Sequence, residues 1–183
     1  MVGSEGSGYL SLQPELRTDV DLVLGTFGKG FGTVGGYIAG AGALVDAIRN
    51  LGRGFIFTTA LPPSAVAATL ANVRHLRGSE SERQRQRELS SLLKLELERH
   101  DIPVVCADSH IVAVRTGTDE ATTFMSTSLM DRGYYITPIK YPTVERGDGR
   151  LRLTVTPAHD EQMITEFVDT FAALWARRDP PVG

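Results

Sequence analysis

A glycine-rich stretch around a single lysine constrains this chain more than any other feature of its sequence. It reads Gly25-Thr-Phe-Gly-Lys29-Gly-Phe-Gly-Thr-Val-Gly-Gly36-Tyr37, with six glycines in thirteen positions. Because glycine has no Cβ, the backbone can turn sharply here and come close to a ligand. A lysine held among such residues can form a Schiff base, or act as a base when burial lowers its pKa. The stretch therefore predicts a cofactor site at Lys29.

Two common nucleotide-binding patterns do not fit this stretch. A Walker A loop needs Ser or Thr after its lysine and a glycine five positions before the Gly-Lys pair, but Gly30 and Val23 occupy those places. A dinucleotide fingerprint fitted to 30–35 should open a helix, whereas the residues from Tyr37 onward favour a strand. On composition alone, a cofactor site and a glycine-rich turn with an incidental lysine are about equally supported.

Composition indicates an ordinary globular protein. The 183 residues are 42 % hydrophobic and 22 % charged, with a net charge of −3, so nothing calls for nucleic acid or an anionic membrane as a partner. Cys106 is the single cysteine, which excludes an intrachain disulfide and fits a reducing cytoplasm; we expect it at a strand end. No apolar run approaches the ~18 residues needed to span a membrane, and the spacing of the four histidines offers no metal site.

Hydrophobic periodicity divides the chain into four segments. Residues 1–18 are expected to be a flexible leader with little regular structure, and 179–183 a tail. Residues 19–100 predict strands at 19–24, 36–39 and 55–58, and helices at 43–51, 63–76 and 79–100. Ser79 and Glu82 match a capping box at the start of the last helix.

Residues 101–178 predict a compact α+β domain. The pattern gives strands at 111–114, 134–137 and 151–155, and helices at 119–132 and 160–177, with a loop at 138–149. Gly133 is a stop signal for the first of these helices. The order strand-helix-strand-strand-helix is typical of a small sheet with helices on one face.

Several motifs occur in the order of a known enzyme family. The Lys29 stretch resembles the cofactor-lysine segment of the α-oxoamine synthases. Further matches follow at Gly54-Phe-Ile-Phe-Thr-Thr59-Ala-Leu-Pro-Pro63, Ser109-His-Ile111, Tyr141-Pro-Thr-Val144, Arg146-Gly147 and Leu151-Arg-Leu153. The resemblance covers about residues 19–178. Tyr141-Pro-Thr-Val144 is most similar to the 5-aminolevulinate synthase branch.

The resemblance implies fold and chemistry. The family has the α/β fold of fold-type-I pyridoxal phosphate transferases, so this chain should hold part of the large-domain sheet plus the α+β small domain. Its members are acyltransferases that condense an amino acid with an acyl-CoA. In the 5-aminolevulinate branch, glycine and succinyl-CoA give 5-aminolevulinate, coenzyme A and carbon dioxide. The siblings 8-amino-7-oxononanoate synthase and glycine C-acetyltransferase are alternatives.

The resemblance also assigns the cofactor residues. Lys29 would hold pyridoxal 5'-phosphate and later take the α-proton of the amino acid. Thr26 would contact the cofactor phosphate, and Thr58 and Thr59 would reach the phosphate of the neighbouring subunit, which requires a dimer. The structural alternatives are a turn-forming threonine at Thr26 and, at Thr58 and Thr59, a strand-end pair that caps the following helix.

Two further residues are assigned to the substrates by resemblance. Arg152 matches the arginine that binds the amino-acid carboxylate, a task that suits the bidentate guanidinium. Arg150 lies on the same strand face and is the competing candidate. Thr143 would contact the acyl carboxylate from a loop that closes over the acyl-CoA, with Gly147 and Gly149 as hinges. The alternative is an ordinary surface loop.

The family carries a long segment before its cofactor lysine. That segment supplies the group stacked on the cofactor ring and an aspartate paired with the pyridine nitrogen. No Asp-Glu-x-His-like segment occurs in residues 1–18. The chain thus resembles the C-terminal half of the family, and we expect a homodimer or a partner chain that supplies the other half. The alternative is an inactive interaction or assembly domain derived from such an enzyme.

Overall fold

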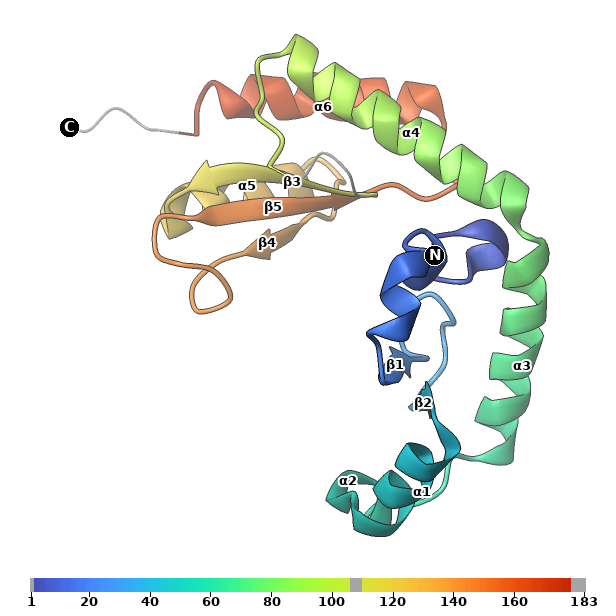
Figure 1. Ribbon diagram of the computed structural model, residues 1–183. Helices are drawn as coiled ribbons and strands as arrows, with labels where there is room; N and C mark the ends of the chain where they lie inside the picture. Colours follow the sequence, from blue (N-terminus) through green and yellow to red (C-terminus); the bar gives the residue numbers. More distant parts are fainter. Residues whose placement is uncertain (1, 106–109, 179–183) are drawn as a thin grey trace. The chain divides into compact units, whose positions relative to one another are not determined.

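The computed structural model describes residues 2–105 and 110–178, which form two compact units, Met1–Arg83 and Gln84–Gly183 (Figure 1). The predicted strand-end position of Cys106, and the Ser109 of the Ser-His-Ile motif, lie outside the described residues.

The first unit is built around an antiparallel hairpin. β1 (Leu22–Thr26) pairs with β2 (Gly36–Gly40), so that Thr26 lies opposite Gly36. Three helices follow: α1 (Gly42–Leu51), α2 (Arg53–Ile56) and α3 (Pro63–Gly78). The N-terminal residues, where we expected little regular structure, form short 3-10 helices at Ser4–Gly6, Tyr9–Ser11 and Pro14–Thr18.

Two strand predictions in the first unit need correction. The strand predicted at 55–58 is wrong, because the N–H groups of Phe55 and Ile56 both donate to the carbonyl of Gly52 at 2.9 Å and close the short helix α2. The strand predicted at 19–24 exists as β1, but it is not buried, and Leu24 is 78 % exposed. A strand needs neighbouring strands to pair with and to cover its side chains. In the described part of the chain, β2 is the only strand that pairs with β1.

The junction between α3 and α4 (Glu80–Arg99) differs from the predicted capping box. The N–H of Ser79 donates to the carbonyl of Leu76 at 3.3 Å, and its hydroxyl donates to the carbonyl of His75 at 3.0 Å. The carboxylate of Glu82 accepts from Ser81 at 2.9 Å. Because α4 follows α3 almost without a break, Ser79 completes the last turn of α3, and its N–H is not left for Glu82 to satisfy.

The second unit is an α+β domain with the predicted element order. Its sheet has the order β3-β5-β4, all antiparallel, from β3 (Ile111–Gly117), β5 (Gly149–Thr154) and β4 (Thr137–Ile139). The helices are α5 (Asp119–Met130), α6 (Glu161–Trp175) and most of α4. Figure 1 shows α4 and α6 side by side, and Arg85 of α4 and Glu161 of α6 form an ion pair of 2.5 Å.

The third predicted strand of this domain is displaced along the chain. We expected it at 134–137 and find it at 137–139, because the N–H of Tyr134 donates to the carbonyl of Leu129 and completes the end of α5. Gly133, with φ at +88°, makes this helix stop as predicted. Pro138 is accommodated inside β4 because β4 is an edge strand, where a missing N–H disrupts no ladder on the open side.

The hydrophobic core lies entirely within the second unit. The alternation along β5 places Leu151 and Leu153 in the core and Arg150 and Arg152 on the opposite face of the sheet. The helical period of α4 and α6 supplies the remaining core side chains, which include Leu89, Leu93, Leu97, Ile164, Val168, Phe171 and Leu174. Trp175 stacks on Phe171 with a ring separation of 5.8 Å, and the guanidinium of Arg178 lies over the Trp175 ring, 3.8 Å from its centre.

Candidate functional site

Lys29 lies in the loop that connects β1 to β2. The loop is closed by main-chain hydrogen bonds from Phe27 to the carbonyl of Gly35, and from Thr33 back to the carbonyl of Phe27, each 2.9 Å long. A tighter turn inside it joins the N–H of Gly32 to the carbonyl of Lys29 at 2.9 Å. Lys29 therefore occupies a defined turn at the tip of a hairpin.

Two side chains of α3 hold this loop. The hydroxyls of Thr33 and Thr69 are 2.7 Å apart, and the amide of Asn72 donates to the carbonyl of Phe31 at 2.6 Å. Thr69 is 7 % exposed. These contacts were not foreseen from the sequence, where the only signal is that Thr69 and Asn72, three residues apart, share one face of the predicted helix.

Thr26 is the last residue of β1, three residues before Lys29. The hydroxyl of Thr26 accepts from the N–H of Gly28 at 3.2 Å and donates to the carbonyl of Gly35 at 3.5 Å. The side chain of Lys29 is exposed and makes no hydrogen bond or ion pair with the described residues. The main-chain N–H groups of residues 29–31 donate to no acceptor among the described residues. The turn therefore has free N–H donors that could bind an anion.

Close packing explains two of the glycines. Gly35 has φ at +92°, and a Cβ there would lie 2.6 Å from a methyl carbon of Leu61. A Cβ at Gly25 would collide with the ring of Tyr37. That ring also stacks on Phe27 at 5.5 Å, so the strand ends that carry the loop are packed against aromatic and aliphatic side chains.

Thr58 and Thr59 follow α2. Both are exposed, and neither makes a hydrogen bond with the Lys29 loop in the described structure. The alternative that they cap the next helix is wrong, because the N-cap of α3 is Pro62 and no side chain makes a capping hydrogen bond there.

In the second unit, Arg150 and Arg152 differ in their partners. Both lie on the exposed face of β5, where Arg152 pairs in register with Ala113 on one side and Thr137 on the other. Arg150 forms an ion pair with Asp148, and its Nε donates to the carbonyl of Asp148 at 3.3 Å. Arg152 has no hydrogen-bond or ion-pair partner among the described residues.

Thr143 is exposed in the loop between β4 and β5. Its N–H donates to the carbonyl of Lys140 at 2.9 Å, and the Lys140 ammonium donates to Thr123 of α5 at 2.9 Å. The hinge expected at Gly149 needs correction, because Gly149 is buried and is the first residue of β5. A Cβ added at this position would lie 2.8 Å from the carbonyl oxygen of Gly117. Any movement of the loop is therefore limited to residues before it.

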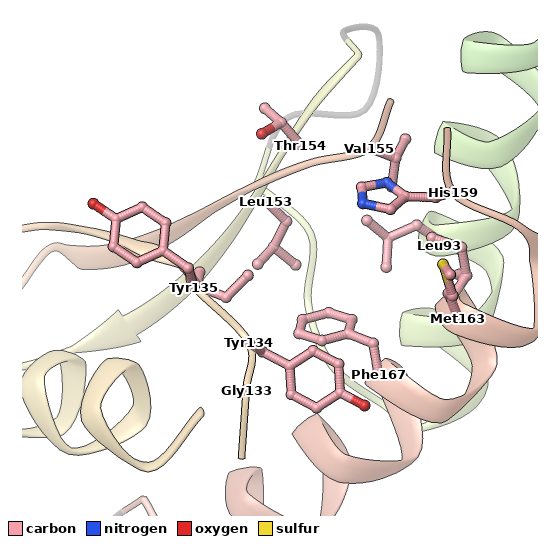
Figure 2. A pocket seen from close by; sticks show the side chains of 12 residues that line it. Leu93, Gly133, Tyr134, Tyr135, Leu153, Thr154, Val155, His159, Met163 and Phe167 are labelled. Atoms are coloured by element: carbon pink, nitrogen blue, oxygen red, sulfur yellow. The ribbon is translucent and has the colours of Figure 1, made fainter. Parts of the chain in front are cut away.

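A separate hollow of about 410 Å³ opens beside the core of the second unit (Figure 2). Its walls are mainly apolar and include Leu93, Tyr134, Leu153, Met163 and Phe167. None of the predicted site residues lines it. Elsewhere in this unit, His110 is exposed, and burial of part of its ring lowers its pKa.

Among residues 2–105 and 110–178, no group of three His, Cys, Asp or Glu side chains is placed to hold a metal ion. None of the helices in these ranges is long and apolar enough to cross a membrane.

Comparison with known proteins places the chain in a family. The sequence profile of the family described as aminotransferase class I and II matches residues 1–171. The chain belongs to this family. The expected resemblance of this chain to 5-aminolevulinate synthases is confirmed. It is 38 % identical to the synthase of Bradyrhizobium diazoefficiens over 183 residues and 42 % identical to that of Rhizobium meliloti over 178 residues.

These relatives are longer than this family member. The matches cover 100 % and 97 % of the chain, but each covers 44 % of the relative. The chain thus spans less than half the length of the curated relatives that it matches.

Solved structures confirm the fold class. Serine palmitoyltransferase from S. paucimobilis, in a form with bound PLP, matches with a TM-score of 0.88 at 29 % identity, over 97 % of this chain and 45 % of that one. The 8-amino-7-oxononanoate synthase of Francisella tularensis has a TM-score of 0.83 at 20 % identity, over 95 % of this chain and 51 % of that one, which shows a shared fold. This chain therefore contains part of the fold of PLP-dependent transferases.

Proposed function

We propose that this chain is the lysine-bearing part of an α-oxoamine synthase, and that the complete enzyme joins glycine to succinyl-CoA to form 5-aminolevulinate. The observation that carries the proposal is the hairpin loop that presents the exposed Lys29 beside Thr26. The similarity to 5-aminolevulinate synthases over almost the whole chain favours this reaction over its siblings.

The residues of the hairpin fit pyridoxal 5'-phosphate. The amine of Lys29 would bind its aldehyde carbon, and the hydroxyl of Thr26 with the N–H groups of the turn would hold its phosphate. When bound, the cofactor supplies an electron sink for the charge that proton removal leaves on the α-carbon. Once the amine of the amino acid has displaced it from the aldehyde carbon, the freed amine of Lys29 would take that proton from the α-carbon.

Arg152 and Thr143 would bind the substrates. The guanidinium of Arg152 has no partner in the described part of the chain, which leaves its donors for the bidentate binding of the glycine carboxylate. The exposed hydroxyl of Thr143 would donate to the carboxylate of the succinyl group. Closure of the loop that carries it would exclude water from the acyl thioester.

A second polypeptide completes the site. Thr58 and Thr59 are exposed and make no hydrogen bond with the Lys29 loop in the described structure, which fits residues that serve the cofactor phosphate of a neighbouring subunit. The relatives extend over more than twice the length matched here. We propose that the ring of the cofactor is held by residues of that additional length, and that the active assembly is a dimer.

Borohydride reduction in the presence of pyridoxal phosphate tests the proposal. The chain has three lysines, Lys29, Lys94 and Lys140, so peptide mass spectrometry identifies the reduced adduct without ambiguity. We expect the adduct on Lys29, and its loss in Lys29→Ala but not in Lys94→Ala. An adduct that remains on Lys94 or Lys140 at the same level would reject Lys29 as the cofactor lysine.

A second candidate function is an assembly domain without catalysis. It is favoured by the exposure of large apolar side chains in the first unit, such as Leu24 and Phe57, each 78 % exposed. The visible absorbance that pyridoxal phosphate develops on binding a lysine separates the two. Its absence in a chain with a folded circular dichroism spectrum, also after addition of the N-terminal half of a relative, would favour the assembly role.

A further inference from the structure

Three arginines gather on the exposed face of the small sheet in the second unit. Arg115 of β3 lies directly opposite Arg150 of β5 in the antiparallel register, and Arg152 follows two residues later on the same face. Like charges directly opposite each other in a sheet are destabilising. This face therefore needs a counter-charge close to the Arg115–Arg150 pair.

Asp148 supplies that charge. Its Oδ1 accepts from the Nε of Arg115 at 2.7 Å, and its Oδ2 forms an ion pair with the guanidinium of Arg150. The carboxylate is only 28 % exposed, and Arg150 is 26 % exposed, so solvent screens this part of the cluster less than an open surface pair. One carboxylate thus engages both opposed arginines.

Asp148 is also the last residue of the loop that carries Thr143. Its N–H donates to the carbonyl of Glu145 at 3.1 Å, and the next residue, Gly149, is already buried in β5. The other end of the loop is tied to α5 through Lys140 and Thr123. The segment between these two ties is exposed at Thr143 and at Arg146, whose guanidinium lies 4.1 Å from the centre of the Tyr141 ring.

We propose that Asp148 is a positioning residue that engages Arg115 and Arg150 and so leaves Arg152 as the one guanidinium on this face that can take a carboxylate. This inference rests on the proposed function for the identity of that carboxylate, but the charge arrangement can be tested without it. A face with one available guanidinium suits a monocarboxylate. Three available guanidiniums would instead favour a polyanion such as phosphate.

The test compares two anions on the full chain by nuclear magnetic resonance of the arginine Nε–H groups, assigned with single Arg→Lys variants. Acetate is expected to shift the signal of Arg152 and to leave those of Arg115 and Arg150 in place. Asp148→Asn is expected to bind inorganic phosphate about fivefold more tightly, which corresponds to the upper range of an exposed ion pair. Phosphate should then shift all three signals.

Two controls separate this effect from a general change in charge. Glu145→Gln removes the same charge three residues away, where the exposed side chain forms no ion pair with the described residues, and should leave phosphate binding unchanged. Asp148→Asn combined with Arg115→Gln and Arg150→Gln should return phosphate binding to the level of the parent chain, because both released guanidiniums are gone.

Clear outcomes would overturn the proposal. In the parent chain, an equal response of Arg115, Arg150 and Arg152 to acetate would show that Asp148 does not hold its partners, whether or not the variant folds. An increase in phosphate affinity of less than twofold in a folded Asp148→Asn chain would also overturn the proposal. Because neither readout involves Lys29, this failure is distinct from a failure of the borohydride test.

Discussion

The two units of this chain differ in how much apolar surface they bury. All seventeen buried hydrophobic side chains of the described residues lie between Leu89 and Leu174, in the second unit. The first unit has none, and Leu24, Leu51 and Phe57 are each 78 % exposed there. Because burial of apolar surface is the main term that favours folding, the second unit has a core that can stabilise it, whereas the described residues of the first unit have none.

The comparison also separates the proposed chemistry from the stable part of the molecule. Lys29 lies in the unit without a core, on a loop held by Thr69 and Asn72. Arg152 lies on a sheet whose opposite face is fully packed. We infer that binding of a partner orders the lysine site, while the arginine face is present beforehand.

Hydrogen exchange should show the largest difference between the units. Amides of β3 and β5, such as Val114 and Leu151, should exchange about a thousandfold more slowly than those of β1 and β2, because only the former are covered by a core. Exchange measured by nuclear magnetic resonance at a concentration where the chain is monomeric tests this. Comparable protection of β1 and β3 would contradict the comparison.

A matched pair of leucine substitutions should sharpen the comparison between the two units. Leu97→Ala removes a side chain that is 0 % exposed in α4 and should lower the free energy of unfolding by about 3 kcal/mol. Leu51→Ala makes the same chemical change in α1 at 78 % exposure and should change it by less than about 0.5 kcal/mol. Urea unfolding followed by circular dichroism measures both. A cost above about 2 kcal/mol for Leu51→Ala would show that the first unit has a core of its own.

The contacts from α3 to the lysine loop should have a smaller effect. Asn72→Ala removes one hydrogen bond to the carbonyl of Phe31, worth about 1 kcal/mol, and should reduce the yield of borohydride-trapped cofactor on Lys29 about fivefold. Ser64→Ala, at an exposed position of the same helix, is the control and should leave the yield unchanged. An unchanged yield in Asn72→Ala would mean that α3 does not position the loop.

The smallest effect concerns pH and the second unit alone. The hydrogen bond from Arg85 lowers the pKa of Glu161 to about 2, from its ordinary value of 4.5. Because the folded-state pKa is the lower one, this contribution to stability is present above pH 4.5 and is lost as the pH falls toward 2. Glu161→Gln should therefore flatten the acid limb of stability against pH, measured by urea unfolding at several pH values. An identical slope in both proteins would exclude the pair as a source of acid sensitivity.

Local signals in the sequence predicted most of the second unit. Gly133 ends α5, and the carboxylate of Asp160 accepts from the N–H of Met163 at 2.8 Å to begin α6, as the periodic pattern and its stop signals indicated. The lysine loop was recognisable because glycines and a lysine are required in a fixed order. These features depend on residues close together in the chain.

The wrong or missing sequence-based predictions have a common cause, which is that they depend on contacts between residues far apart in the chain. The apolar residues 55–58 favour a strand, but a strand needs a neighbour, and without one the chain closes helical hydrogen bonds to Gly52. Thr69 and Asn72 contact residues about forty positions away, and Asp148 joins Arg115 across the sheet. No pattern in the sequence specifies which residues such side chains meet.

The stacked arrangement of Phe171, Trp175 and Arg178 has a practical consequence for the experiments above. Trp175 is the single tryptophan of the chain, and its ring contacts both the ring of Phe171 and the guanidinium of Arg178 at the end of α6. Intrinsic fluorescence excited at the indole band is therefore an optical probe of the second unit alone. Phe31→Trp, two residues after Lys29, would give the first unit its own signal and allow the folding of each unit to be followed separately.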